Sequence, residues 1–325
     1  MNMLRSLSAV LTLLAALCST SVQAQSNWPS SPITLIVPYA PGGYSDTRMR
    51  LLGRKLTEKL GQPVVIENKA GAGGVIGTNI IAKANPDGYT IGCGSFAPLA
   101  INPILMKSIP YDAATDLAPV ILLEISPLVL SVSSQLPVKN LAELIALAKA
   151  DPNKLTYGSS GQGGAHHLSG EMLEAEAKIE LTHVPYKGGA PAATDLMAGH
   201  LAMMFEMGYA ALPAIRSEKI KPIAVTSMKR LAALPNVPTM SEAGLPSFES
   251  YNWQGIVVPA KTPNAIVLRL NKAINEILQD PDMAKAIADG LSQPVGGSPE
   301  NFGRFIKSER EKWGKVIKTA NITAE

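Results

Sequence analysis

VPYAPGGYSD, residues Val37–Asp46, follows the short apolar run ITLIV (Ile33–Val37) and precedes a segment with helical spacing. The apolar residues of the segment 49–60 fall on one helical face, and Gly61 then suits the end of a helix. The stretch is therefore a strand–loop–helix junction with two prolines and two adjacent glycines. A shorter sequence that is similar to it, VPYKGG, occurs at Val184–Gly189.

A glycine loop that leads into a helix is a ready site for an anion. The first amides of a helix lack intrahelical acceptors, and about half a unit of positive charge develops there. Gly42 and Gly43 would let a ligand approach these amides, while Pro38 and Pro41 would stiffen the loop. We expect Asp46 to hold the loop's own N–H groups, because its charge would repel an anion. The alternative is an ordinary turn whose glycines supply positive φ angles.

A second junction of this kind, YGSSGQGGAHHL, spans Tyr157–Leu168. It runs from a predicted strand through four glycines into a predicted helix, with Leu168 and Met172 on the buried face. Two such junctions would direct two helix N-termini into one cleft and offer about one unit of positive partial charge together. That arrangement suits a carboxylate held reversibly by backbone amides.

The first 24 residues have the pattern of a cleaved secretory signal peptide. Arg5 supplies a positive start, Leu7–Leu17 is apolar, and Val22–Ala24 offers a small-x-small cleavage site. A membrane anchor is the alternative, but the apolar run is too short to span a bilayer. A lipoprotein site at Cys18 is disfavoured, because Leu17 stands where a small residue is required. We therefore expect a periplasmic protein.

Charge and cysteine content exclude several classes of protein. Without the leader, 28 basic and 26 acidic residues remain, so the formal charge is 28 − 26 = +2. Such a near-neutral chain without basic runs is not expected to bind nucleic acid. Cys93 is then the one remaining cysteine, which rules out an intrachain disulfide, and we expect it to be an inert core residue. A remaining chain of about 300 residues favours two lobes.

Short apolar runs alternate with amphipathic stretches, which predicts an α/β fold with largely parallel sheets. The predicted helices after the first are Leu141–Ala150, Leu268–Leu278 and Phe302–Ala320. The predicted strands are Ile33–Val37, Val64–Glu67, Tyr89–Gly94, Val120–Ile125, Leu128–Val132, Thr156–Gly158, Leu181–Val184, Met203–Phe205, Ile223–Thr226 and Gly255–Val258.

Two places suggest crossings of the chain between lobes. Two strand runs abut at Glu124–Pro127, and Leu234–Ser250 is rich in turn residues. We therefore expect lobe 1 to comprise residues 25–124 and 250–325, and lobe 2 to comprise residues 125–249.

The sequence does not contain the motifs of nucleotide-binding, hydrolase or metal sites in complete form. No Gly-Lys-Ser/Thr phosphate loop is present, and the glycines of Gly71–Gly77 do not fit a dinucleotide fingerprint. In GSSGQ, Gln162 replaces the last glycine of a hydrolase nucleophile elbow. No histidines are spaced i, i+4 for a metal. His166 and His167 are adjacent and must face different ways, and either one would reach the cleft. We expect no metal and no cofactor.

With both loops in view, the sequence resembles the periplasmic solute receptors of tripartite tricarboxylate transporters, the Bug family. The resemblance spans the chain beyond the leader and rests on a series of motifs in order. They are VPYAPGGYSD, ENKAGAGGVIG (Glu67–Gly77), ANPDGYT (Ala84–Thr90), INP and IPYD (within Ile101–Asp112), YGSSGQGGAHHLSG, HVPYKGG followed by DLMAGH, AVTSMKR followed by LPNVPT, and ESYNWQGIVVPAKTP.

The resemblance implies a two-lobed, type II periplasmic binding protein of the Venus-flytrap kind, which closes over a small organic carboxylate. Such a receptor presents its ligand to membrane transporter subunits, and we expect a monomer. The ligand-binding residues it implies lie in the two glycine loops, at the end of a strand and in the second VPY loop. They are Tyr39, Pro41, Gly42, Gly43, Tyr44, Asp46, Ser95, Ser159, Gly163, Gly164, Ala165, His166, Tyr186, Lys187 and Gly188.

Two positions depart from the family pattern. Gly164 stands where the family often has Ser or Thr, and Tyr39 stands where Phe is common, with the bulky Tyr44 just after the glycines. We therefore hypothesise a larger or flatter carboxylate than usual, an aromatic acid stacked on tyrosine. The alternative is that Tyr39 only packs beneath the loop.

Two other function classes stay open. A ligand sensor that passes its closed state to a signalling protein would share this fold and these loops. A carboxylate-processing enzyme is disfavoured, because no nucleophile, base and oxyanion donor are placed together in the sequence.

Overall fold

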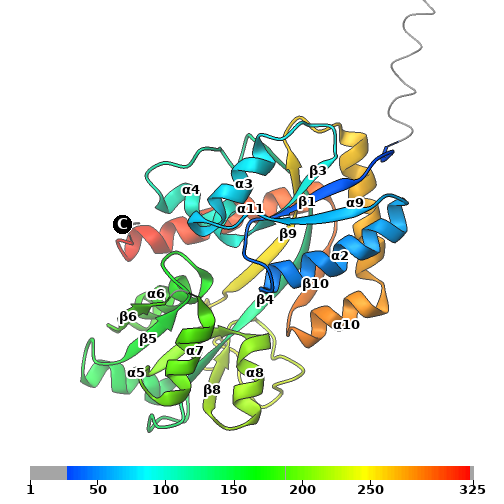
Figure 1. The fold of residues 1–325 in the computed structure, drawn as a ribbon. Helices are drawn as coiled ribbons and strands as arrows, with labels where there is room; N and C mark the ends of the chain where they lie inside the picture. The colour runs from blue at the N-terminus through cyan, green and yellow to red at the C-terminus, as the bar shows by residue number, and fades with distance from the viewer. Residues whose placement is uncertain (1–27, 187, 323–325) are drawn as a thin grey trace, which may run out of the picture.

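The computed structural model describes residues 28–186 and 188–322 and consists of two lobes joined by long strands (Figure 1). The predicted signal peptide and Lys187 lie outside the described residues. Within the described part of the chain, no helix has the length and apolar character needed to cross a membrane.

The described strands form one ten-stranded curled sheet in which each lobe contributes one half. The order along the sheet is β2–β1–β3–β9–β4–β7–β5–β6, and β10 and β8 both pair with β4. The strands are β1 (Ile33–Val37), β2 (Val64–Asn68), β3 (Thr90–Ser95), β4 (Leu117–Ser133), β5 (Thr156–Ser159), β6 (Thr182–Pro185), β7 (Met203–Met207), β8 (Ile220–Val225), β9 (Tyr251–Pro259) and β10 (Gln293–Gly296).

Strand β4 passes from one lobe into the other. Its first part, Leu117–Pro127, pairs with β9, and Leu128–Val132 then pairs with β7. The prediction of two separate strands here is wrong, because the chain continues as one strand through Pro127. In Figure 1, β4 and β9 run side by side from the upper lobe towards the lower one.

The expectation of largely parallel sheets is only half right. Parallel pairs occur within each lobe, where β1 lies between β2 and β3 and where β5 lies between β6 and β7. The pairs that involve β4 are antiparallel, as is the β3–β9 pair. The reason is topological. The chain crosses between the lobes in opposite directions along β4 and β9, so these neighbours must be antiparallel.

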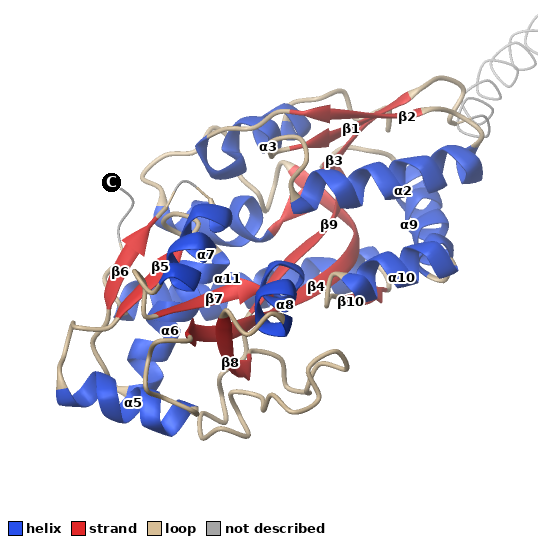
Figure 2. Cartoon of the chain, turned by 60° about the horizontal axis from the view of Figure 1, so that its bottom comes forward, coloured by secondary structure: helices blue, strands red, loops and turns tan. Residues whose placement is uncertain are grey.

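Helices cover both faces of each half-sheet (Figure 2). The helices are α2 (Tyr44–Leu60), α3 (Val75–Ala82), α4 (Asn102–Leu105), α5 (Leu141–Ala150), α6 (Ala165–Ala177), α7 (Gly189–Ala198), α8 (Gly208–Arg216), α9 (Asn264–Leu278), α10 (Pro281–Asp289) and α11 (Pro299–Thr319), with short 3₁₀ and π turns at Ala72–Gly74 and Ala97–Ile101. In lobe 1 the helices α2 and α9 bury Leu52 and Leu270 in one cluster with β1 and β3, while the last described helix, α11, packs Phe302 on the other face.

The predicted helices are all present, and Gly61 ends α2 in the left-handed conformation as expected. Cys93 is fully buried in the core of lobe 1, which confirms its predicted place there. Burial raises the pKa of the Cys93 thiol to about 12, so the reactive thiolate is disfavoured.

Candidate functional site

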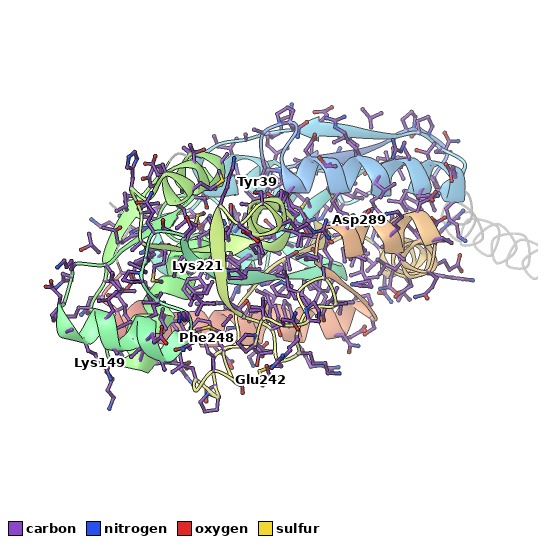
Figure 3. The ribbon with its side chains drawn as sticks, turned by 90° about the horizontal axis from the view of Figure 1, so that it is seen from below. Tyr39, Lys149, Lys221, Glu242, Phe248 and Asp289 are labelled. Atoms are coloured by element: carbon purple, nitrogen blue, oxygen red, sulfur yellow. The ribbon has the colours of Figure 1, made fainter. Side chains whose placement is uncertain are left out.

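A cavity of about 820 Å³ lies between the two lobes and is lined by residues of both. Figure 3 places Tyr39, one of its lining residues, where the blue N-terminal part of the ribbon meets the green middle part. The lining residues include both glycine loops, the start of α7, the end of β7 with the start of α8, and residues 252–254 of β9.

The first glycine loop presents the N-terminus of α2 to this cavity. Gly43 is the N-cap residue, with φ −77° and ψ 175°, and no side chain caps the helix. The first amides of α2 are therefore left for water or a ligand. Gly43 and Tyr44 both line the cavity, so these amides lie at its wall.

Asp46 braces the first loop from behind. Its side chain is buried and accepts hydrogen bonds from the Gly42 amide at 2.8 Å and from Asn68 Nδ2 at 2.8 Å. Arg50 Nε donates a third at 2.9 Å, and this bond contributes most to lowering the pKa of Asp46 to about 2. Asn68 also donates to the Tyr39 carbonyl at 3.0 Å. The position of Asp46 agrees with its expected role of holding the loop.

The second glycine loop presents α6 in the same way. Gly164 is its N-cap residue, with φ −77° and ψ 164°, again without a capping side chain. A Cβ at Gly164 would lie 3.3 Å from Ser160 Oγ. Gly164, Ala165 and His166 line the cavity. Both lobes thus direct a glycine-capped helix N-terminus towards one space.

The two adjacent histidines have different environments. His166 lines the cavity, with its Nδ1 2.9 Å from Ser160 Oγ, and burial lowers its pKa to about 4. His167 is buried behind the loop, where its Nδ1 accepts a hydrogen bond from the Gly163 amide at 3.1 Å. The other ring nitrogen of His167 therefore carries the proton and faces Glu171 Oε1 at 3.2 Å.

A stack of rings supports the second loop. The rings of His167 and His183 lie 4.0 Å apart, and Tyr157 stacks on His183 at 4.9 Å. His183 Nε2 is 2.7 Å from Ser159 Oγ, which in turn accepts from the Gly161 amide. These contacts hold the loop from the side away from the cavity.

The two tyrosines of the first loop are engaged with protein groups. The hydroxyl of Tyr39 bonds to Ser95 Oγ at 2.7 Å, and burial raises the pKa of this phenol. The ring of Tyr44 stacks on Tyr209 of α8, and its hydroxyl meets Ser126 Oγ at 2.6 Å. One face of the Tyr44 ring is therefore taken in this structure, and stacking of a ligand on either tyrosine stays a prediction.

The structure brings eight of the predicted ligand residues to the cavity wall. They are Tyr39, Pro41, Gly43, Tyr44, Ser95, Gly164, Ala165 and His166. Six described residues of the predicted set do not line it: Gly42, Asp46, Ser159, Gly163, Tyr186 and Gly188. The amides of Gly42 and Gly163 already donate to Asp46 and His167. The hydroxyl of Tyr186 donates to Asp195 at 2.6 Å. These groups shape the loops behind the wall.

Sequence reasoning missed several lining residues, of which Glu206 carries the clearest signal. Others are Asn102, Tyr209, Asn252, Trp253 and Gln254. Glu206 is an acid within MMFEM, a strand whose five residues are all buried. A charged residue in a buried apolar strand could have been noticed in the sequence. Trp253 and Gln254 enter through β9, whose pairing with β3 and β4 is distant in sequence.

Burial raises the pKa of the Glu206 carboxyl to about 7. The described lining residues include no lysine and no arginine. Among the residues that the structure describes, no group of three or more His, Cys, Asp and Glu side chains could hold a metal ion.

Comparison with known proteins places the chain in a family. Residues 49–322 match the model of the tripartite tricarboxylate transporter family receptor, TctC. The chain is 38% identical over 319 residues to Protein BugT of Bordetella pertussis, covering 98% of each chain.

Two solved structures are similar over nearly their whole length. R. palustris Rpa4515 with adipate shares 37% identity at a TM-score of 0.83, covering 91% of this chain and 99% of that one. MatC from Rhodopseudomonas palustris with bound malate shares 32% identity at a TM-score of 0.78, covering 89% and 100%. The chain belongs to the tripartite tricarboxylate transporter receptor family, which includes the Bug proteins.

Proposed function

We propose that this protein captures a small organic carboxylate in the cavity between its lobes. The observation that carries the proposal is the pair of helix N-termini, each capped by a glycine, at the wall of one cavity. Amides at a helix N-terminus favour anions through hydrogen bonds and the helix dipole. Relatives with adipate and malate bound support this class of ligand.

We infer that the lobes move relative to one another about β4 and β9. The pairing of β4 with β9 as far as Pro127 and with β7 from Leu128 onwards supports the predicted division into residues 25–124 with 250–325 and residues 125–249. A ligand that touches both loops binds the closed form better and so shifts the population towards it. X-ray scattering should show a more compact molecule with saturating ligand, and equal compactness would contradict the mechanism.

In this proposal the leader of residues 1–24 directs export to the periplasm, and the loaded receptor delivers its ligand to membrane transporter subunits. The family description supports a transport role. Co-purification of the ligand-loaded chain with the two membrane subunits would test delivery. Loading that makes no difference to the interaction would contradict it.

A thermal-shift screen tests ligand binding directly. Protein without its leader, refolded to remove any carried ligand, is screened against di- and tricarboxylates, acidic amino acids and aromatic acids. A ligand at a hundred times its Kd should stabilise the fold by about 2.7 kcal/mol, which shifts the midpoint by several degrees. Uncharged amides of the same acids are the matched controls. If no carboxylate shifts the midpoint of the folded protein, the proposal fails.

A further inference from the structure

We propose that Glu206 selects the ligand by its second polar group, favouring an acid that carries an ammonium or hydroxyl group over one that carries a second carboxylate. This inference rests on the proposed function, in which the two glycine loops hold the first carboxylate.

The strand register places Glu206 beside the second loop. Strands β5 and β7 are parallel, with Tyr157 opposite Met203 and Gly158 opposite Met204. Glu206 lies two residues beyond Met204, at the carboxyl end of β7, and Ser160 correspondingly lies two residues beyond Gly158, just after the end of the neighbouring strand β5. Residues i and i+2 of a strand share a face, so Glu206 lies on the face of Met204, which packs with Ala192 of α7.

The carboxyl group of Glu206 is buried and open to the cavity. The residue is only 3% exposed and lines the cavity. Burial is the one cause that raises its pKa, to about 7, and no described residue donates it a hydrogen bond. An unpaired buried carboxylate is unfavourable, so a ligand that supplies a donor would relieve that cost.

Among the residues that the structure describes, none supplies a free cation to a second carboxylate in this part of the cavity. Arg48 lies near the hinge, but its Nε donates to Glu124 Oε1 at 2.9 Å and its Nη2 to the Ala286 carbonyl. Neither arginine nor lysine occurs among the described lining residues. A second carboxylate facing Glu206 would therefore require Glu206 to be protonated, because two adjacent carboxylates repel each other when both are ionised.

Among the described residues that line the cavity, Glu206 is also the one whose pKa lies near neutral pH. The other titratable lining residues are Tyr39, Tyr44, His166 and Tyr209. Burial raises the pKa of each of these tyrosines and lowers that of His166 to about 4. The charge of Glu206 should change most between about pH 6 and pH 8, while the others keep theirs.

Calorimetry with matched ligands tests the inference. The probes are ω-amino, ω-hydroxy and α,ω-dicarboxylic acids of four to six carbons, titrated into the wild type and Glu206→Gln at pH 6 and pH 8. Glutamine keeps the size of the side chain but cannot be ionised. Glu242→Gln, on an exposed loop far from Tyr39 in Figure 3, is the control.

At pH 8 we expect the wild type to bind an amino or hydroxy acid at least about tenfold more tightly than the dicarboxylate of equal length. Binding of the dicarboxylate should tighten about tenfold from pH 8 to pH 6, as Glu206 gains its proton. Glu206→Gln should lose this pH dependence and most of the preference for the ammonium group. Glu242→Gln should behave as the wild type.

Two results would overturn the inference in distinguishable ways. If carboxylates bind but Glu206→Gln shows the wild-type selectivity and pH dependence, Glu206 is not a selectivity residue and the proposed function stands. If no probe or other carboxylate binds the folded wild type or either variant, the proposed function fails and the inference falls with it.

Discussion

The ring of Tyr44, at the start of α2, lies against the ring of Tyr209, at the start of α8, with centroids 5.3 Å apart and planes within 6°. This stack links the two lobes directly across the cavity wall. The hydroxyl of Tyr44 also bonds to Ser126 of β4 and to Ser292, just before β10. The contact therefore connects the first glycine loop to the strand that passes between the lobes.

Replacing Tyr209 should loosen the lobes. Tyr209→Ala removes a stack worth about 0.5–1.5 kcal/mol, and Tyr209→Phe keeps it. X-ray scattering of the ligand-free protein should show a larger radius of gyration for the alanine variant and an unchanged one for the phenylalanine variant. Equal radii for all three proteins would show that the stack does not hold the lobes together.

Substitution at Gly164 should block the anion site while preserving the fold. Its φ of −77° suits a β-branched residue, and a Cβ there has only Ser160 Oγ as near as 3.3 Å. Gly164→Val should weaken binding of the best carboxylate about tenfold or more, because its methyl groups obstruct the first amides of α6.

Calorimetry measures this effect, with Gly314→Val in α11 as the control. A Cβ at Gly314 has ordinary contact, at 3.6 Å from Ile104. If Gly164→Val binds as tightly as the control, the second loop does not hold the carboxylate.

Asp46 should matter for both stability and binding. Asp46→Ala leaves the Gly42 amide and one N–H of Asn68 without an acceptor, which should cost about 1–3 kcal/mol in the free energy of unfolding. Because the folded-state pKa of Asp46 is lowered to about 2, its stabilisation is present above about pH 4 and lost as the pH falls through about 2. The difference between wild type and variant should shrink over that range.

Urea unfolding at several pH values measures the effect of Asp46. Asp289→Ala is the control, since Asp289 is 65% exposed and pairs with Lys285 one turn away. That pair should contribute less than about 0.5 kcal/mol. Equal losses in the two variants would contradict a bracing role for Asp46.

His183 should make the fold sensitive to acid. Burial, with a contribution from the neighbouring His167, lowers the pKa of His183 to about 4. Below about pH 6.5 the unfolded chain binds a proton at His183 that the folded chain does not, so this residue destabilises the fold progressively down to about pH 4. Relative to the wild type, His183→Gln should gain about 1–3 kcal/mol of stability over that window.

The stability of His183→Gln must be compared with that of the wild type at each pH, because other buried groups change the stability with pH in the opposite direction. Glu174 and Glu206 both have pKa values raised to about 7, so they favour the fold at acidic pH. Their effects are common to both proteins and cancel in the difference. His200→Gln, whose side chain is 73% exposed, is the control. A stability difference between His183→Gln and wild type that does not change with pH would contradict the prediction.

Local patterns account for what the sequence predicts well. The run from β1 through Gly43 into α2 is decided by neighbouring residues, and so is the second junction into α6. The expected role of Asp46 in holding the loop is local too, because its carboxylate accepts from the amide of Gly42, four residues earlier. Such features follow from capping and chain geometry over short distances.

Distant pairing accounts for what the sequence does not predict. Pro127 suggests a break, yet β4 continues through it because β9 pairs with it from residue 251 onwards. The helix α8, which contains Pro213, is absent from the predicted helices, and a proline inside a helix is unusual. The amide of Gly163 is a local exception: it donates to His167, four residues further along the chain, and the prediction of Gly163 as a ligand residue did not take this bond into account.

A crystal structure of the complex with the best carboxylate found by calorimetry tests the central claim most directly. The account predicts carboxylate oxygens within about 3.2 Å, directly or through one water, of amide nitrogens at the starts of both α2 and α6. It also predicts His166, not His167, at the ligand. A carboxylate seated elsewhere in the cavity, or held by side chains without contact to either helix N-terminus, would contradict it.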